Sequence, residues 1–398
     1  MDRENCALLE KVGLVSGAVL SDLDGDGLPE LVLACEWGPL RIFKNARGKL
    51  LPWNAPVSIN HQPSTLNQLT GWWNGVTTGD FDGDGRMDII ASNWGLNCHY
   101  HRSGASRVYY GDLDGNGTVD IIEAYFDKAV EVPERNLNAM SAALPFVREK
   151  FATHAAYGQA NLREIFGDKL QHAAVLEATT LATTLFLNRG DHFEAVVLPA
   201  EAQFSPAFAL CVGDYDGDGN EDVFLSQNFF ATQPETARLD AGRGLWLRGD
   251  GRGHLAPVPG QESGVKVYGE QRGAALCDYD GDGRIDLAVT QNGAETKLYH
   301  NVGAKPGLRV RLKGSAGNPQ AVGAQLRLSF GLRQGPMREI HAGSGYWSQD
   351  SALQVMARPE FPNRIQVLWP GGKATLTPIP QGADEIMVEM NGSLHVVR

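Results

Sequence analysis

The sequence predicts an all-β fold in which repeated, blade-sized units form a β-propeller. One acidic loop of nine residues occurs five times along the 398-residue chain. Short apolar runs that are typical of buried strands lie on both sides of the loops. The first two loops begin 58 residues apart, and the last two begin 64 residues apart. This spacing fits one loop for each unit of about four strands, which is the repeat of a propeller.

The repeated loop follows the pattern Asp-x-Asp-Gly-Asp-Gly-x-x-Asp, with Glu30 at position 9 of the first copy and Asn116 at position 5 of the third. Side-chain oxygens therefore stand at positions 1, 3, 5 and 9, and the glycines at positions 4 and 6 allow the positive φ angles of a tight bend. Calcium takes about six to eight oxygen ligands in a flexible shell, which the carbonyl at position 7 and water can complete. The sequence thus predicts up to five calcium ions. The predicted ligands are Asp22, Asp24, Asp26, Leu28 and Glu30; Asp80, Asp82, Asp84, Arg86 and Asp88; Asp112, Asp114, Asn116, Thr118 and Asp120; Asp214, Asp216, Asp218, Asn220 and Asp222; and Asp278, Asp280, Asp282, Arg284 and Asp286.

The charge of the chain agrees with metal binding. Its formal net charge is −12, and five divalent ions would bring it to −2. Without a counter-ion, the carboxylates within each loop would repel one another, which argues against solvated acidic turns that hold no ion. No basic stripe is present to neutralise phosphates, so we expect no nucleic-acid partner.

The EF-hand is the alternative calcium loop, and it requires a bidentate Glu at position 12. Only the third copy has one, Glu123. The residues that follow the loops, such as 31–34 and 223–226, are short β-rich apolar runs rather than amphipathic helices. We therefore expect each loop to join two adjacent strands, and Glu123 to be a solvent-facing strand residue.

A further strand recurs downstream of the loops. Residues 41–45, 184–188, 244–248 and 297–301 each have the pattern of an aromatic strand that ends in a turn. The second and third loops begin only 32 residues apart. These two loops therefore share a blade or flank a shortened one.

Together, the loops and strands over about residues 12–303 resemble the FG-GAP/VCBS repeats of integrin-type propellers and of many bacterial surface proteins. The resemblance implies a ring of up to about seven blades, with calcium in the hairpin loops. Five loops leave too little chain for seven blades, so we expect a smaller ring or a chain without its N-terminal blades. We assign residues 1–303 to the propeller.

Residues 127–182 interrupt the β pattern. Leu137, Met140, Leu144, Val147 and Phe151 are spaced as on a helix, and Pro145 either interrupts that helix or starts a second one. This predicts a helical insertion that projects from one blade. We expect it to cover the ring or fill the place of a blade; the alternative is a partner-binding or gating element.

Residues 304–398 read as a second, all-β domain, because alternating segments follow one another without acidic loops. Residues 307–312, 321–324, 343–349 and 367–372 resemble the ASPIC/UnbV domain. With the propeller, the chain resembles the cartilage acidic protein family, which implies an extracytoplasmic calcium-binding protein without established catalysis, used in adhesion or matrix interactions. If the domain boundary is right, deletion of residues 304–398 leaves the propeller folded.

The location is predicted indirectly. Residues 1–6 are polar and contain no signal peptide, yet weak calcium loops fill only where calcium is abundant. We therefore expect an exported protein, secreted, periplasmic or on the cell surface, whose signal peptide is absent from this chain. No apolar run is long enough to span a membrane.

The predicted function is a non-catalytic interaction or adhesion module for a protein or glycan ligand. No catalytic motif stands out, and residues 343–345 have the flanks of a turn rather than of a nucleophile elbow. The alternative is a propeller that binds or hydrolyses carbohydrate through its acids and aromatic rings. The candidate rings are Trp72, Trp73, Trp94, Trp246 and Trp347.

Overall fold

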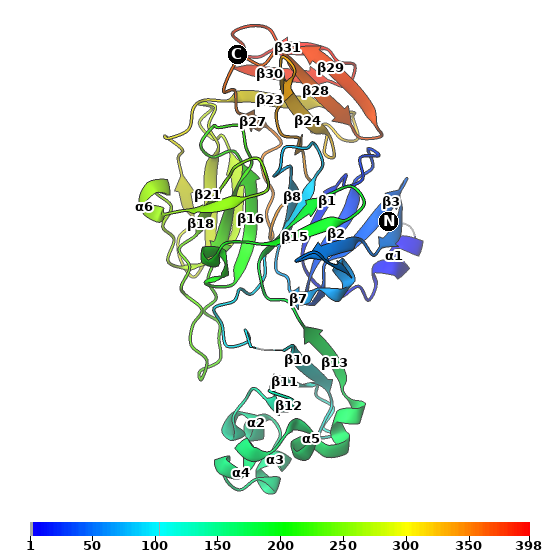
Figure 1. Ribbon diagram of the computed structural model, residues 1–398, viewed down its shortest axis with the longest axis vertical. Coiled ribbons are helices and arrows are strands. Elements are labelled where there is room, and N and C mark those ends of the chain that lie inside the picture. Colours follow the sequence, from blue (N-terminus) through cyan, green and yellow to red (C-terminus); the bar gives the residue numbers. More distant parts are fainter. Residues whose placement is uncertain (1–2, 103) are drawn as a thin grey trace.

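The computed structural model describes residues 3–102 and 104–398, so the first two of the polar residues 1–6 lie outside it. Strands hold 43% of the residues and helices 12%, which confirms the all-β class. Figure 1 shows three parts along the long axis. A C-terminal unit lies at one end, blade-like sheets fill the middle, and an inserted unit lies at the other end.

In the described residues, four sets of antiparallel strands form the blades. Blade 1 consists of β1 (Leu14–Ser21), β2 (Glu30–Pro39), β3 (Arg41–Ala46) and β4 (Lys49–Trp53). Blade 2 consists of β8 (Val76–Gly79), β9 (Asp88–Ala91), β14 (Thr184–Asn188) and β15 (Phe193–Val197). Blade 3 consists of β16 (Ala207–Gly213), β17 (Asp222–Gln227), β18 (Leu245–Gly249) and β19 (Leu255–Val258). Blade 4 consists of β20 (Glu270–Cys277), β21 (Asp286–Asn292) and β22 (Lys297–Tyr299).

Shorter elements complete this region. Strand β7 (Thr70–Trp72) pairs with β2, while β5 (Pro56–Ile59) and β6 (Gln62–Thr65) extend blade 2 beyond β15. The helical turns are α1 (Arg3–Leu9), η1 (Leu66–Gln68), η3 (Ala200–Gln203) and α6 (Gly260–Ser263).

The blades pack face to face, which is why their strands are apolar on both faces. Every residue of β9 and of β17 is buried. Ile90 of blade 2 packs in one cluster with Leu210 of blade 3, and Phe224 of blade 3 packs with Leu287 of blade 4. The first strands β1, β8, β16 and β20 contact one another in that order, so they lie side by side, and we call the line along which they meet the axis.

The insertion is larger than residues 127–182, because it occupies the whole connection between β9 and β14. Its sheet contains β10 (Ser106–Gly111), β11 (Asp120–Asp127), β12 (Val130–Pro133) and β13 (Ala174–Ala178). Its helices are α2 (Leu137–Ala143), α3 (Phe146–Lys150), α4 (His154–Gln159), α5 (Leu162–Phe166) and η2 (Gly167–His172). Pro145 separates α2 from α3.

Two expectations about this region are wrong. The third acidic loop joins β10 to β11 inside the insertion, so it neither shares a blade with the second loop nor flanks a shortened blade. The helices lie at the far end of the molecule from the C-terminal unit and project away from the blades (Figure 1). They therefore neither cover the ring nor fill the place of a blade.

The C-terminal unit contains two sheets around a core of its own, which includes Leu326, Val367 and Trp369. One sheet has the order β27-β23-β30-β31, and the other has the order β25-β24-β28-β29 with β26 beside β24. The bounds are β23 (Leu308–Lys313), β24 (Gln325–Phe330), β25 (Arg333–Gln334), β26 (Arg338–Glu339), β27 (Gln354–Met356), β28 (Arg364–Trp369), β29 (Lys373–Pro378), β30 (Glu385–Glu389) and β31 (Leu394–Val396).

Residues 337–351, here named the axial strap, leave this unit between β24 and β27 and run along the first strands of the blades. Ser21 of β1 donates its hydroxyl to the Glu339 carboxylate at 2.5 Å. Val76 of β8 donates its backbone N–H to the carbonyl of Gly345 at 3.2 Å. The strap therefore adds hydrogen bonds to strands that lie far earlier in the chain.

The strap also contacts the first strands of the other two blades, through one hydrogen bond and one ring contact. Leu276 of β20 donates its N–H to the Asp350 carboxylate at 2.8 Å. The rings of Tyr346 and Phe208, the latter on β16, meet edge to face at 5.3 Å between centroids. One segment of the C-terminal unit thus contacts the first strand of each of the four blades along their axis.

Candidate metal centres at the ends of the blades

Each acidic loop joins two adjacent antiparallel strands, as the strand pattern predicts. The first, second, fourth and fifth loops connect the first two strands of blades 1 to 4, and we name them the ring loops. The third connects β10 to β11 in the insertion. The glycines at positions 4 and 6 of all five loops have φ between +72° and +96°.

The carboxylate at position 1 is the centre around which the loop folds. In the fourth loop, Asp214 accepts backbone N–H groups from Gly217 at 2.7 Å, Asp218 at 3.2 Å and Gly219 at 2.8 Å. The first, third and fifth loops repeat this pattern. The glycines let three successive amides converge on one side chain, which other residues at positive φ would resist.

The carboxylate at position 9 ties the loop to the third strand of its blade. Asp222 accepts the N–H of Tyr215 at 2.9 Å and that of Gly249, at the end of β18, at 2.8 Å. Asn45, Asn188 and Asn301 donate in the same way to the other ring loops. The turns after the predicted aromatic strands are therefore part of these sites.

Acidic side chains converge in every loop. In each group below, one ligand atom of each residue lies within 4.8 Å of those of the others. The groups are Asp22, Asp24 and Glu30; Asp80, Asp82 and Asp88; Asp112, Asp114 and Asp120; Asp214, Asp216 and Asp218; and Asp280, Asp286 and His300.

Positions 5 and 7 lie against each other. The N–H at position 7 donates to the side-chain oxygen at position 5 in all five loops. The residues at position 7 are Leu28, Arg86, Thr118, Asn220 and Arg284. The two arginines also turn their guanidinium groups back onto position 5, where they pair with Asp84 and Asp282.

A basic side chain faces the carboxylate at position 3 of every ring loop, a feature that we did not predict. The pairs are Lys44 with Asp24 at 2.8 Å, Arg189 with Asp82, Arg248 with Asp216 at 2.7 Å, and His300 with Asp280 at 3.5 Å. The signal in the sequence is a basic residue beside the end of each third strand. Lys44, Arg189 and Arg248 offset part of the negative charge at the first, second and fourth loops.

Burial disfavours the ionised carboxyl groups of the first, second and fourth loops. It is the largest cause of the raised pKa values of their carboxyl groups, because the ionised form loses its hydration. The pKa rises to about 6 for Asp22 and Asp214, to about 7 for Glu30 and Asp80, and to about 8 for Asp88 and Asp222. In the exposed third loop, the N–H of Gly117 and its neighbours instead hold the pKa of Asp112 below its usual value.

The second loop offers the clearest sign of a missing positive partner. Among the described residues, Oδ1 of Asp80 and Oδ1 of Asp82 are buried without a hydrogen-bond partner. The other oxygen of Asp80 accepts the N–H groups of Gly85 at 3.0 Å and Met337 at 2.8 Å. Buried, unsatisfied carboxylate oxygens are costly, and an all-oxygen donor set suits a hard divalent cation such as calcium. The residues therefore fit such an ion.

Glu123 is not the solvent-facing residue that we expected. It is half-buried in β11, where its carboxylate pairs with Arg135 at 2.5 Å and accepts the Tyr100 hydroxyl at 2.7 Å. Both partners belong to the insertion, so Glu123 has a structural role there.

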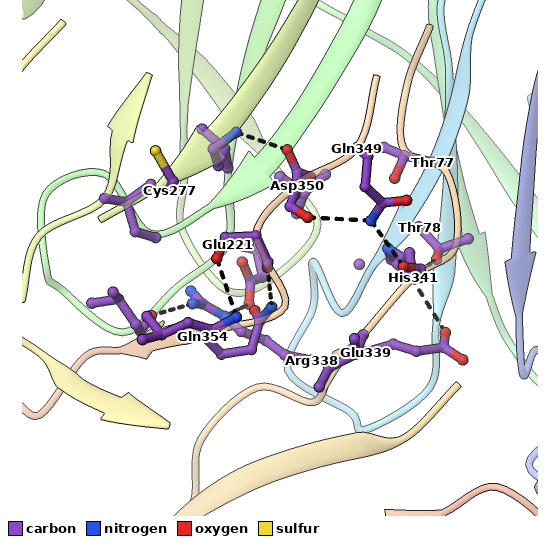
Figure 2. Close-up of a pocket in the computed structure, with 18 of the residues that line it drawn as sticks. Thr77, Thr78, Glu221, Cys277, Arg338, Glu339, His341, Gln349, Asp350 and Gln354 are labelled. Carbon is purple, nitrogen blue, oxygen red and sulfur yellow. Dashed lines mark hydrogen bonds and ion pairs between the residues drawn. The ribbon is translucent and has the colours of Figure 1, made fainter. Parts of the chain in front are cut away.

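A polar pocket lies where the strap passes the blades (Figure 2). Its volume is about 60 Å³, which is room for water rather than for an organic ligand. Arg338 pairs with Glu221 across it at 2.6 Å, and Thr78 lies 2.9 Å from Nε2 of His341. These contacts lock the strap to blades 2 and 3.

The candidate tryptophans fall into two groups. Trp73 is fully buried in the core, and Trp94 is buried with its ring stacked on Trp72 at 4.0 Å. Trp347, in contrast, is 84% exposed and stacks on Tyr346 with an interplanar angle of 4°. Packing therefore accounts for the first group but not for Trp347.

Residues 22–91, which contain the first two loops, match the family model of the FG-GAP-like repeat. No curated protein matches the chain. Among solved structures, the chain is similar to BBS1N in its crystal structure with ARL6DN, soaked with mercury, with 11% identity and a TM-score of 0.26 over 94% of this chain and 96% of that one. It is also similar to the V. cholerae biofilm matrix protein Bap1, with 13% identity and a TM-score of 0.20 over 92% of this chain and 51% of that one. TM-scores this low establish no shared fold.

Proposed function

We propose that this protein is a non-catalytic, calcium-binding interaction module that works outside the cytoplasm. The observation that carries the proposal is the pair of oxygens, Oδ1 of Asp80 and Oδ1 of Asp82, that are buried in the second loop without a hydrogen-bond donor. Calcium would supply the missing positive charge. The loop brings its carboxylates together around the site of the ion. The backbone N–H groups that donate to positions 1 and 9 hold the loop in this shape.

The fold supports an interaction role. The FG-GAP-like repeat over residues 22–91 is the kind of unit from which adhesion propellers are built. In this proposal, the C-terminal unit is an ASPIC/UnbV-like domain, and the ligand is a protein or a glycan. Among residues 3–102 and 104–398, no helix is long and apolar enough to cross a membrane. Weak calcium loops fill where calcium is millimolar, which favours an extracytoplasmic site of action.

Calorimetric titration of calcium into chelator-stripped protein tests the metal part of the proposal. We expect several sites, up to five, with dissociation constants from micromolar to millimolar, and a higher melting temperature in calcium. Magnesium at the same concentration is the control, since it demands a smaller, more regular shell. Absence of both heat and thermal shift would contradict calcium binding.

A second candidate function is oligosaccharide binding at Trp347. The exposed ring borders a groove of about 610 Å³ that is also lined by Arg272, Asn292 and Gln349. A flat aromatic ring beside planar polar groups is a common way to hold a sugar. The strap anchors this ring near the axis, so its place is fixed by the fold.

Replacing Trp347 with Ala tests this second function. We expect the variant to lose at least tenfold in affinity for any glycan that the protein captures on an array, because the stacking surface is gone. Tyr268→Ala removes another exposed ring, one that is 63% exposed, and should leave binding unchanged. Equal binding by both variants would contradict a sugar site at Trp347, and turnover of the glycan would contradict the non-catalytic assignment.

A further inference from the structure

The C-terminal unit rests on the ends of the ring loops. Gly371 donates its N–H to the carbonyl of Gly27 in the first loop at 2.9 Å, and Gly307 donates to Gly283 in the fifth at 2.7 Å. Met337 reaches Asp80 in the second loop, and Arg338 reaches Glu221 in the fourth. Every ring loop thus lies between its own blade and the C-terminal unit.

The charge that this unit brings differs from loop to loop. At the first loop it brings a carboxylate, because Glu339 accepts the N–H of Asp22 at 3.1 Å. At the fifth loop it brings a cation. Nη1 of Arg309, on β23, lies 3.1 Å from the position-1 carboxylate of Asp278, and the two side chains are only 11% and 0% exposed.

Arg309 is held at this place by more than the loop. Its Nε lies 3.1 Å from Glu385 on the neighbouring strand β30, and Glu385 also pairs with Arg311 at 2.6 Å. A second carboxylate therefore holds the guanidinium beside Asp278. The carboxylate itself does not need Arg309, because it already accepts the backbone N–H groups of positions 4 to 6.

We propose that Arg309 sets the calcium affinity of the fifth loop, acting as a built-in cation that competes with the ion for Asp278. The inference rests on the proposed calcium binding. It adds that Arg309 makes the calcium affinity of the fifth loop differ from that of the other loops. Two positive charges that share one buried carboxylate repel each other strongly in an environment of low polarity. By linkage, calcium in the fifth loop weakens the contact between Asp278 and β23 to the same extent.

The test is a calcium titration of the full chain with Arg309→Met. We expect one class of sites to tighten by about tenfold or more, the effect of removing a nearby buried charge. Arg311→Met is the matched control, because Arg311 shares Glu385 but does not reach the loop, and it should leave all affinities unchanged. In a background where Asp280→Asn and Asp282→Asn disable the fifth loop, Arg309→Met should have no effect.

The outcomes separate this inference from the function on which it rests. Unchanged affinities in Arg309→Met, with normal calcium binding by the parent chain, would overturn the role of Arg309 alone. A parent chain that binds no calcium would overturn both. If Arg309→Met melts without cooperativity, Arg309→Gln replaces it, because the amide keeps a donor toward Glu385 while removing the charge.

Discussion

A chain that ends at residue 303 should fail to form a stable propeller. The axial strap belongs to the C-terminal unit, yet it supplies hydrogen bonds or ring contacts to β1, β8, β16 and β20. Its removal would take from Ser21, Val76 and Leu276 the hydrogen-bond partners that they have in the strap, at roughly 0.5–1.5 kcal/mol each. Together with the lost ring contact of Phe208, these losses are a substantial part of the roughly 5–15 kcal/mol by which a domain is stable. We expect a truncated chain that lacks a cooperative thermal transition, measured by circular dichroism and calorimetry.

A single glycine tests the same idea without removing a domain. Gly345 has φ +63°, and a Cβ built there would lie 2.6 Å from the backbone of Leu210 on β16. Gly345→Ala should therefore cost about 3 kcal/mol or more, from the left-handed backbone and the forced separation of strap and blade together. Gly331 is a matched control, since it has φ +64° and open space around its Cβ. Gly331→Ala should cost only about 1–2 kcal/mol, the backbone part alone.

The truncation result would contradict the expectation drawn from the sequence, that residues 1–303 fold by themselves. Two cooperative transitions in the full chain, one of which survives in the truncated chain, would restore that expectation. Equal losses in Gly345→Ala and Gly331→Ala would show that the strap contributes no tight contact to the axis.

The sequence specifies the loops well because their geometry is local. The side chain of Asp214 and the amides that it accepts lie within five residues, and Gly217 and Gly219 carry the bend in their own φ angles. The strands on either side are equally local, because burial on both faces leaves a continuous apolar run. These patterns are enough to give the fold class and the position of each loop.

The sequence alone does not reveal which residues far apart in the chain contact each other. Ser21 and Glu339 are 318 residues apart, and nothing around residues 343–345 distinguishes an axial segment from a turn between strands. The cations at position 3 are hidden for the same reason, since Arg189 and Asp82 are 107 residues apart. The third loop has the same local pattern as the others, so its place outside the ring is visible only once β10 pairs with β13.

Replacing Asp80 with Asn should change stability in opposite directions with and without calcium. In stripped protein, Oδ1 of Asp80 is buried without a donor beside Asp82. An amide nitrogen in its place would remove a repelled charge and could donate to Asp82, while the amide oxygen keeps the N–H groups of Gly85 and Met337. Without calcium, we therefore expect the variant to have a higher melting temperature than the parent chain.

In saturating calcium the variant should instead have the lower melting temperature, because it loses a ligand at the position around which the second loop folds. An ion at 100 times its dissociation constant stabilises the folded state by about 2.7 kcal/mol, and most of that is lost if the second loop no longer fills.

Asp112→Asn in the exposed third loop is the matched control, since its carboxylate is neither buried nor in contact with the strap. We expect that variant to lose one bound ion in calcium but to gain no stability in stripped protein, because no buried charge is removed. A loss of stability in Asp80→Asn that is equal with and without calcium would mean that Asp80 serves only the backbone of its loop, and that the unpartnered oxygen is not a metal ligand.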